Sequence, residues 1–337
     1  MSKKNQLASI FSGIGILRLL EAAPHRPQLL VLNYHRIGDA SSSPYDPGVF
    51  STTAEGFEEQ IRMLKSRYRF ATVSHALDII ENRESMSETL ILMTFDDGYR
   101  DNFKEAFPIL RRHGVEAIFF LVTSSIETEH VPWWDEIAYL AKSHSPKTLR
   151  INYPHAVEFD LTTDSFEENL RKLLLVFKSP ATTDPARFLA MLKEAVGFTG
   201  EDLHADLMMS WDDVREMRDG GMTIGLHTHS HRILAKLNLK QQIEELKHCR
   251  AKLETELGSE AVLLSYPVGL RESFNADTIA AAREVGLRAG FSFYGGTNLA
   301  GKIDRFDIHR VAFESYAPAS RVRLTTAVMA ATGTTWI

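Results

Sequence analysis

The chain contains 337 residues, enough for one large α/β domain or two smaller domains with well-buried cores. With 44% hydrophobic and 24% charged residues, the composition is typical of a globular protein and excludes a disordered or fibrous one. The formal net charge of −6, without a long lysine or arginine cluster, argues against a nucleic-acid partner. The single cysteine, Cys249, excludes an internal disulfide and fits a reducing, cytoplasmic compartment.

Residues 1–25 are expected to form a separate N-terminal amphipathic helix. Its apolar residues recur at helical spacing: Leu7, Ile10, Phe11, Ile14 and Leu17. Arg18 and Glu21 interrupt this segment before the roughly 20 apolar residues that a membrane span needs have accumulated. The helix therefore either packs on the domain or makes peripheral membrane contact through residues 7–20.

Apolar strands and amphipathic helices then alternate along the chain. We expect strands at 28–34, 69–73, 90–95 and 116–122, with helices at 57–64, 75–82 and 103–110. The regular alternation is lost at about 130–205, which we interpret as a helical insertion or lid. It resumes with helices at 211–218, 239–257 and 276–285 and strands at 221–226, 261–266 and 289–293.

Such alternation indicates a parallel sheet or barrel. Because the chain contains seven or eight of these units, a (β/α) barrel is favoured over a doubly wound sheet. We assign residues 26–320 to this domain and residues 321–337 to a C-terminal tail. On the long helix at 239–257, Glu244, Glu245 and Lys247 are interpreted as part of a solvent-exposed face.

Two adjacent carboxylates, Asp96 and Asp97, follow the strand at 90–95 directly. Successive strand side chains point to opposite faces, so the strand has to end there, and Gly98 allows the chain to turn. Acids at the carboxyl end of a buried strand lie where α/β enzymes place their chemistry. The alternative is a helix N-cap followed by an acidic first turn.

Three histidines, His227, His229 and His231, follow another predicted strand. His227 and His231 are four residues apart and can direct one ring nitrogen each to a single ion, whereas His229 would point elsewhere. A catalytic metal needs three protein ligands and an open position for water, so one carboxylate of the acidic pair completes the set. Histidine and carboxylate ligands without thiolate suit Zn²⁺, with Co²⁺, Ni²⁺, Fe²⁺ or Mn²⁺ as alternatives.

The segment from Thr94 to Gly98, TFDDG, together with the HTHSH segment from His227 to His231, resembles the polysaccharide deacetylases, the NodB-type carbohydrate esterases. The resemblance implies that Asp97 binds the metal with His227 and His231, and that Asp96 is the general base. It also implies that Thr228 braces the histidine loop by hydrogen bonding. The fold it implies is a distorted (β/α)7 barrel.

A third family motif, R-x-P-[Y/F]-G, appears here as Ser265-Tyr266-Pro267-Val268-Gly269. Ser265 replaces the arginine that steadies the catalytic aspartate in the family, and Arg310 and Arg36 are candidates to supply that cation. The backbone N–H of Val268 takes the position that helps to stabilise the oxyanion in family members.

The resemblance also requires a histidine acid. Tyr34-His35-Arg36 resembles a segment of the biofilm poly-N-acetylglucosamine deacetylases, whose motif order is circularly permuted, and this favours His35. The alternatives are His309, near the C-terminus, and a purely structural role for His35.

The function implied is metal-dependent removal of acetyl groups from N-acetylated amino sugars of a glycan or glycan precursor. Tyr99, Trp133 and Trp134 are candidate sugar-stacking residues. The alternatives are an O-acetyl esterase or cyclic-amide hydrolase of the same fold, and a catalytically weak sugar-binding module.

Overall fold

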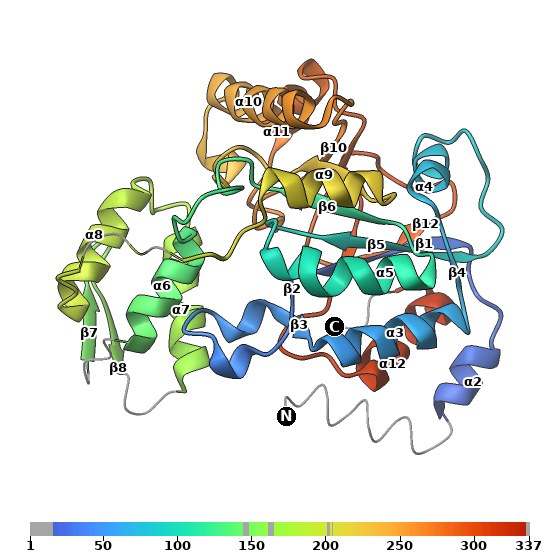
Figure 1. Cartoon of the computed structure of the whole chain (residues 1–337), viewed down its shortest axis with the longest axis horizontal. Coiled ribbons are helices and arrows are strands. Elements are labelled where there is room, and N and C mark those ends of the chain that lie inside the picture. The colour runs from blue at the N-terminus through green and yellow to red at the C-terminus, as the bar shows by residue number, and fades with distance from the viewer. Residues whose placement is uncertain (1–15, 144–147, 161–164, 201–202, 204, 335–337) are drawn as a thin grey trace. The chain divides into compact units, whose positions relative to one another are not determined.

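The computed structural model describes residues 16–143, 148–160, 165–200, 203 and 205–334 (Figure 1). Two compact units share the chain. The barrel unit comprises Met1–Gly38, Phe50–Glu127 and Met208–Ile337, and the insert unit comprises Asp39–Val49 and Thr128–Leu207. None of the described helices combines the length and the apolar character that crossing a membrane would take.

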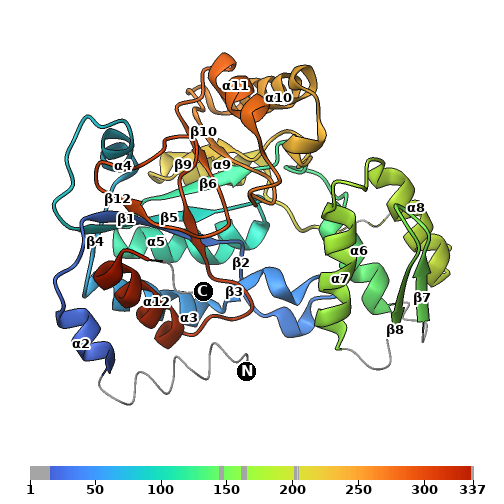
Figure 2. The same cartoon turned by 180° about the vertical axis from the view of Figure 1, so that it is seen from behind.

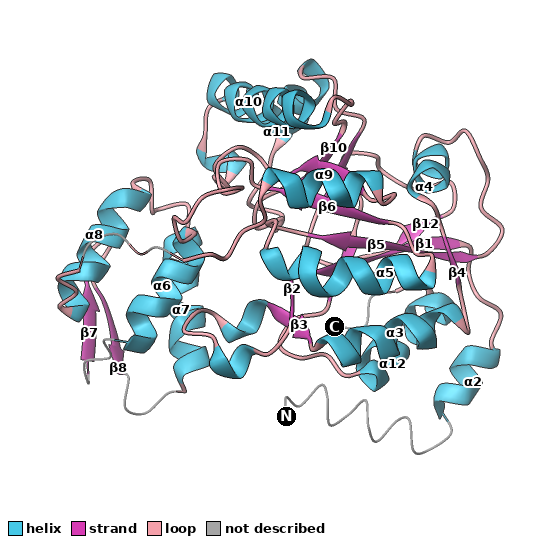
Figure 3. Ribbon diagram, in the orientation of Figure 1, coloured by secondary structure: helices cyan, strands magenta, loops and turns pink. Residues whose placement is uncertain are grey.

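Seven parallel strands among the described residues form the centre of the barrel unit (Figure 3). They are β1 (Gln28–Tyr34), β5 (Thr89–Phe95), β6 (Ala117–Leu121), β9 (Thr223–Leu226), β10 (Leu263–Ser265), β11 (Ala289–Phe291) and β13 (Arg310–Ala312). Each pairs with the next in this order up to β11, and β13 pairs with β1. A parallel bridge between Phe291 and Ile308, just before β13, closes the circle. The expected distorted (β/α)7 barrel is confirmed.

The strands are buried on both faces, which explains their continuous apolar runs. Every residue of β1, β5 and β6 is buried. Polar residues are few in these strands, and Asn33, Thr94, Ser265 and Arg310 are all at most 1% exposed. A buried polar group needs a hydrogen-bond partner, so these four positions indicate a polar network inside the barrel.

Short strands and the helices complete the barrel unit. The remaining strands are β2 (Arg36–Ile37) paired with β3 (Phe50–Thr52), β4 (Arg69–Phe70) at the edge of β5, and β12 (Asn298–Leu299) antiparallel to β1. The helices are α3 (Ala54–Lys65), α4 (Val73–Ile80), the π-helical turn η3 (Asn102–Ala106) with α5 (Phe107–His113), α9 (Trp211–Asp219), η4 (Leu234–Lys236), α10 (Leu239–Leu257) and α11 (Ala276–Glu284). Most begin at a side-chain cap such as Thr53, Thr72, Ser210 or Asn238, which accepts a hydrogen bond from a first-turn N–H.

The expectation of a C-terminal tail at 321–337 is wrong. Residues Ala319–Thr332 form the helix α12, which packs against α3 and α2 (Figure 2). Its Val322, Leu324, Thr326 and Met329 are all buried. Because side chains on several sides of the helix are buried, its sequence lacks the apolar stripe that marks an amphipathic helix.

Only part of the expected N-terminal helix is described, as α2 (Ile16–Ala22). Leu17 is buried against Leu324 and Ala327 of α12, whereas Leu19 is 73% exposed. Leu7, Ile10, Phe11 and Ile14 lie outside the described residues. The cytoplasmic location and the membrane contact of this segment stay predictions.

The insert unit contains the region expected to be an insertion and has a core of its own. It consists of α6 (Trp133–Ser143), β7 (Thr148–Ile151), β8 (Val157–Asp160), α7 (Phe166–Lys178) and α8 (Pro185–Val196), with the short 3₁₀ turns η1 (Ala40–Ser42) and η2 (Pro47–Val49). The antiparallel pair β7–β8 was not expected from the sequence. Its strands have only four residues each, so the alternation of polar and apolar residues in them is too short to stand out from the surrounding helical segments.

If α12 is part of the core, replacing Met329 by alanine should lower the free energy of unfolding by about 2–5 kcal/mol, because a fully buried side chain is removed. Thr332→Ala, at the exposed end of the same helix, should change it by less than about 0.5 kcal/mol. Urea unfolding measures both values. Equal, near-zero effects would mean that these residues are a tail after all.

Candidate metal and catalytic site

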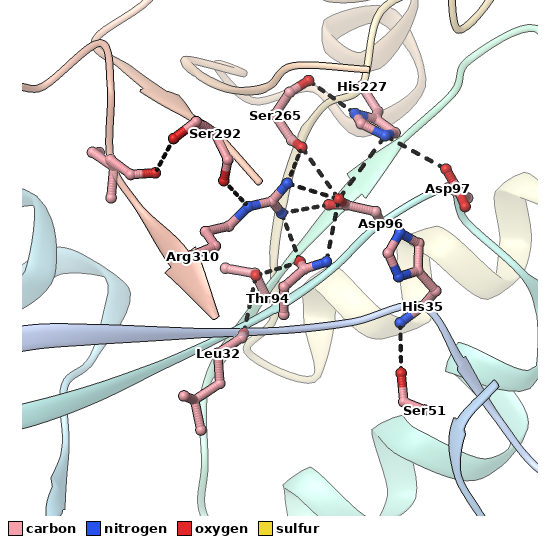
Figure 4. A network of polar contacts seen from close by, with 12 residues as sticks. Leu32, His35, Ser51, Thr94, Asp96, Asp97, His227, Ser265, Ser292 and Arg310 are labelled. Atoms are coloured by element: carbon pink, nitrogen blue, oxygen red, sulfur yellow. Dashed lines mark hydrogen bonds and ion pairs between the residues drawn. The ribbon is translucent and has the colours of Figure 1, made fainter. Parts of the chain in front are cut away.

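Four of the predicted site residues, His35, Asp96, Asp97 and His227, gather at the carboxyl ends of the barrel strands (Figure 4). Asp96 and Asp97 follow β5, His227 follows β9, and His35 follows β1. Parallel strands present their carboxyl ends on one side of a barrel, so residues far apart in the sequence meet there.

Asp97, His227 and His231 form a group that could hold a metal ion. One ligand atom from each lies within 4.8 Å of the others, and all three residues are buried. Nε2 of His227 and of His231 lie 3.5 and 3.6 Å from Oδ1 of Asp97. The donor set therefore fits a divalent metal with imidazole and carboxylate ligands.

The ring of His227 is oriented by the strand beside it. Its Nδ1 lies 2.8 Å from the carbonyl oxygen of Ser265, which can only accept a hydrogen bond. Nδ1 therefore carries the proton of the neutral ring, and Nε2 presents its lone pair to the site. This is the usual way in which a ligating histidine is fixed.

The backbone at the ligands adopts a conformation that few residues tolerate. Asp97, Thr228 and His231 have φ values of 78°, 64° and 53°, in the left-handed region. Such positions cost free energy for residues other than glycine and persist where the surrounding structure fixes them. At Asp97 the left-handed conformation ends the strand, as expected from the adjacent acids.

The resemblance implied that Thr228 braces the histidine loop by hydrogen bonding, and in the structure its backbone carbonyl does so, accepting a 3.4 Å hydrogen bond from the N–H of Thr123. The Thr228 hydroxyl is buried without a hydrogen-bond partner among the described residues. The loop is also held through His229, whose carbonyl accepts a 2.9 Å hydrogen bond from the N–H of Ser124. Nδ1 of His229 lies 3.0 Å from Oγ1 of Thr123, so this ring points away from the other two, as expected.

Asp96 is held by a buried arginine that lies more than 200 residues later in the sequence. Nη1 and Nη2 of Arg310 each donate a 2.8 Å hydrogen bond to a different oxygen of the carboxylate. The missing arginine at position 265 is thus replaced by Arg310 of β13, one of the two candidates named from the sequence. The other candidate, Arg36, pairs with Asp101 at 2.8 Å.

The remaining donors of Arg310 are also satisfied. Nε donates to the Ser292 carbonyl at 2.9 Å, Nη1 to Oδ1 of Asn33 at 2.6 Å, and Nη2 to Oγ of Ser265 at 2.8 Å (Figure 4). Sequence analysis missed Asn33 and Ser292. Asn33 could have been found, because it is a polar residue inside an otherwise apolar strand that pairs with Thr94 of the acidic motif.

These charges set the protonation of the two acids. Burial alone would raise the pKa of Asp96, but the charge of Arg310, followed by that of His227, holds it well below its usual range. Burial likewise acts to raise the pKa of Asp97, but its contacts with His227, His35 and His231 lower it overall. Both carboxyl groups are therefore ionised at neutral pH.

Of the two candidate acids, the structure brings His35 to the site. It lies close enough to Asp96 and Asp97 for a charge on its ring to lower the pKa of both carboxyls, and its backbone is held by Ser51 Oγ at 3.2 Å and Asn102 Nδ2 at 2.6 Å. Its ring packs edge-on against Phe293, with a centroid separation of 5.4 Å.

His309 lies in another cluster. Its Nε2 is 3.3 Å from Oη of Tyr294 and 3.7 Å from Oδ2 of Asp307. Successive residues of an extended chain point to opposite sides, so His309 points away from the polar network that Arg310 enters.

The other predicted residues are placed as follows. Val268 follows β10 with φ 65°, and its N–H donates no hydrogen bond to the described residues.

The aromatic candidates for sugar binding lie in different surroundings. Tyr99 is fully buried, with the Arg36 guanidinium 4.6 Å from its ring centroid. Trp133 and Trp134 belong to the insert unit, where Trp133 stacks on Phe177. Sugar binding by these three aromatic residues stays a prediction.

Several known proteins resemble this chain in sequence. A putative polysaccharide deacetylase, YxkH of Bacillus subtilis, is 22% identical over 264 residues, covering 78% of this chain and 63% of the relative. The poly-beta-1,6-N-acetyl-D-glucosamine N-deacetylase of Staphylococcus aureus is 28% identical over 111 residues, covering 30% of this chain and 38% of the relative. The chain thus spans less than two thirds of the length of these curated relatives.

Solved structures share the fold. IcaB from Ammonifex degensii superposes with a TM-score of 0.59 at 19% identity, covering 91% of this chain and 98% of that one. The deacetylase PplD of Streptococcus pyogenes, in complex with acetate, superposes with a TM-score of 0.56 at 16% identity, covering 88% and 97%. The family model for polysaccharide deacetylases matches residues 83–290, more than half of the sequence and including both motifs of the site. The chain therefore belongs to the polysaccharide deacetylase family.

Proposed function

We propose that this chain is a metal-dependent hydrolase that removes acetyl groups from N-acetylated amino sugars of a polysaccharide or glycan precursor. The observation that carries the proposal is the different surroundings of two adjacent acids. Asp97 lies within reach of His227 and His231, whereas Asp96 is held separately by Arg310. This difference supports a role in metal binding for Asp97 and a role in proton transfer for Asp96.

Asp97, His227 and His231 would hold the metal, and Zn²⁺ suits this donor set best. When bound, such an ion supplies Lewis acidity toward a carbonyl oxygen and lowers the pKa of a coordinated water. Co²⁺, Ni²⁺, Fe²⁺ and Mn²⁺ accept the same ligand types and are the alternatives that metal analysis distinguishes.

Asp96 is proposed as the general base. Its carboxylate is ionised at neutral pH and can therefore accept a proton from the attacking water. The two hydrogen bonds from Arg310 fix the plane of the carboxylate and limit its rotation. A fixed base needs no reorganisation when the proton moves.

His35 is proposed as the general acid that protonates the departing amine. Its Nδ1 is buried without a partner among the described residues. The N–H of Val268, which also lacks a described partner, is proposed to donate a hydrogen bond to the oxyanion. Both groups therefore have hydrogen-bonding capacity that no described residue takes up.

An N-acetyl group is favoured over an O-acetyl ester or a cyclic amide as the substrate. The Staphylococcus aureus relative is named as an N-deacetylase of poly-beta-1,6-N-acetyl-D-glucosamine. The absence of the motif arginine at Ser265 leaves room for a relative that acts on another bond, but Arg310 makes the ion pair with Asp96 that this arginine would make. Acetate release from N-acetylated and O-acetylated sugar oligomers, measured side by side, tests this preference.

Substitutions of Asp96 and of Asp97 should have different effects on metal binding and on turnover. Asp96→Asn should still bind metal but lose turnover by about 10²–10⁴-fold, because its proton acceptor is gone. Asp97→Asn should lose metal and activity together. Metal analysis and acetate release measure the two properties, and Asp212→Asn, a 90% exposed carboxylate, is the control. Near-normal turnover by Asp96→Asn would exclude it as the base.

Replacing Arg310 should affect both stability and the pH profile. Arg310→Met leaves the buried Asp96 carboxylate without its partner, which should cost about 3–5 kcal/mol in the free energy of unfolding. The charge of Arg310 lowers the pKa of Asp96, so without it that pKa rises. Because Asp96 acts when ionised, the acid limb of the rate profile should move to higher pH.

The matched variant for this test is Arg310→Lys. Lysine keeps the positive charge but cannot form the paired hydrogen bonds of a guanidinium. It should therefore shift the acid limb less than methionine does. An acid limb unchanged in both variants would show that Arg310 does not tune the base.

The choice between the two histidines is tested by parallel alanine substitutions. His35→Ala should lower the rate of acetate release by about 10²–10⁴-fold, because proton donation to the amine is lost. His309→Ala should stay near the wild-type rate, because its ring contacts Tyr294 and Asp307 instead. The reverse pattern would move the acid to His309.

A further inference from the structure

The loop that carries the two histidine ligands is held by a carboxylate from a neighbouring helix. Glu245 of α10 accepts three hydrogen bonds from two residues that lie between His227 and His231. Its Oε1 accepts from Oγ of Ser230 at 2.6 Å, and its Oε2 accepts from the N–H groups of Ser230 and His229 at 3.1 and 3.2 Å. No lysine or arginine among the described residues forms an ion pair with Glu245.

Sequence analysis assigned Glu245, with Glu244 and Lys247, to a solvent-exposed face, and the structure contradicts this assignment for Glu245. Glu244 is 55% exposed and lies 4.0 Å from Lys240 on the same helix, as a solvated face predicts. Glu245 is partly buried and turned toward the histidine loop. Its own backbone is fixed, because Leu246 and Cys249 of α10 are buried in the core.

The loop needs such a hold because its backbone is strained. Thr228 and His231, on either side of the contacted residues, both have φ in the left-handed region. Conformations of this kind persist only where the surroundings fix them. Two adjacent N–H groups that converge on one anion form a concave site that stabilises a tight turn. Glu245 supplies that anion from within the chain.

We propose that Glu245 is a positioning residue that fixes the loop in its metal-binding conformation before the metal arrives. The inference rests on the proposed metal centre. Without Glu245, the loop can relax from its strained backbone, and His231 moves away from His227 and Asp97. Metal binding then has to restore the conformation, and that cost appears as weaker binding.

The test measures the dissociation constant for Zn²⁺ by competition with a chromogenic chelator, in the full-length protein. Glu245→Ala removes all three hydrogen bonds and should weaken Zn²⁺ binding on the order of 10-fold or more. Glu245→Gln keeps one acceptor oxygen and should give an intermediate value. Glu244→Ala removes a charge one residue away and should bind Zn²⁺ as the wild type does.

A second measurement separates positioning from general stability. The metal-free melting temperatures of Glu245→Gln and Glu244→Ala should match, and the absorption spectrum of bound Co²⁺ should change only in the Glu245 variants. Ser230→Ala, which keeps the two backbone hydrogen bonds, should weaken metal binding less than Glu245→Ala. This variant keeps the test decisive if Glu245→Ala does not fold.

Two outcomes would overturn the proposal, and they differ from each other. Wild-type Zn²⁺ affinity and an unchanged Co²⁺ spectrum in Glu245→Gln and Ser230→Ala would refute the role of Glu245 alone. A wild-type protein that binds no metal would refute the metal centre, and with it the positioning role.

Discussion

A buried ion pair joins the closure of the barrel to its candidate catalytic site. Arg310 lies on β13, the strand that pairs with β1 and follows the bridge to β11, and its guanidinium reaches Asp96 at the end of β5. A buried pair repays its desolvation only when the remaining polar groups are also satisfied. Here Asn33, Ser292 and Ser265 take the other hydrogen bonds of Arg310. Polar residues at or next to the ends of β1, β5, β10 and β11 therefore depend on the same arginine.

The adjacent acids acquire different roles because the chain turns between them. Asp96 directs its side chain into the network of Arg310, whereas Asp97, with φ 78°, presents its carboxylate to the histidines. A strand that continued would place the two side chains on opposite faces of the sheet. The turn, with Gly98 after it at φ 92°, keeps both at the same end of the barrel. Local backbone geometry thus gives two identical adjacent residues different surroundings, and the ligand and base roles proposed for Asp97 and Asp96 rest on that difference.

The sequence predicts correctly those elements and motifs that are marked by a pattern in a short stretch of consecutive residues. The strands of the barrel are buried on both faces and read as apolar runs, and the acidic and histidine motifs are short and contiguous. It did not reach features that depend on tertiary contacts. Arg310 could be named only as one of two candidates, because nothing near position 310 shows which carboxylate it meets. Glu245 and Glu244 are identical neighbours in the sequence, and they differ only in the side of α10 on which they lie. The helix α12 was missed because burial on several sides removes the periodicity that identifies a helix.

The charges of the site favour a cation at the point where the three ligand side chains meet. Asp96 and Asp97 are both ionised, and Arg310 neutralises only one of them, so a negative charge is left among buried groups. Burial lowers the pKa of His227, but the two carboxylates raise it above its usual value overall. Without a metal, the negative charge therefore favours protonation of His227 at Nε2. A divalent ion would satisfy the same negative charge and needs the same lone pair, so proton and metal compete for one nitrogen. The outcome of that competition depends on the geometry of the ligand loop. A proton binds to one nitrogen, whereas a metal ion binds to three ligands. The metal gains this advantage only if the loop holds His231 close to His227 and Asp97.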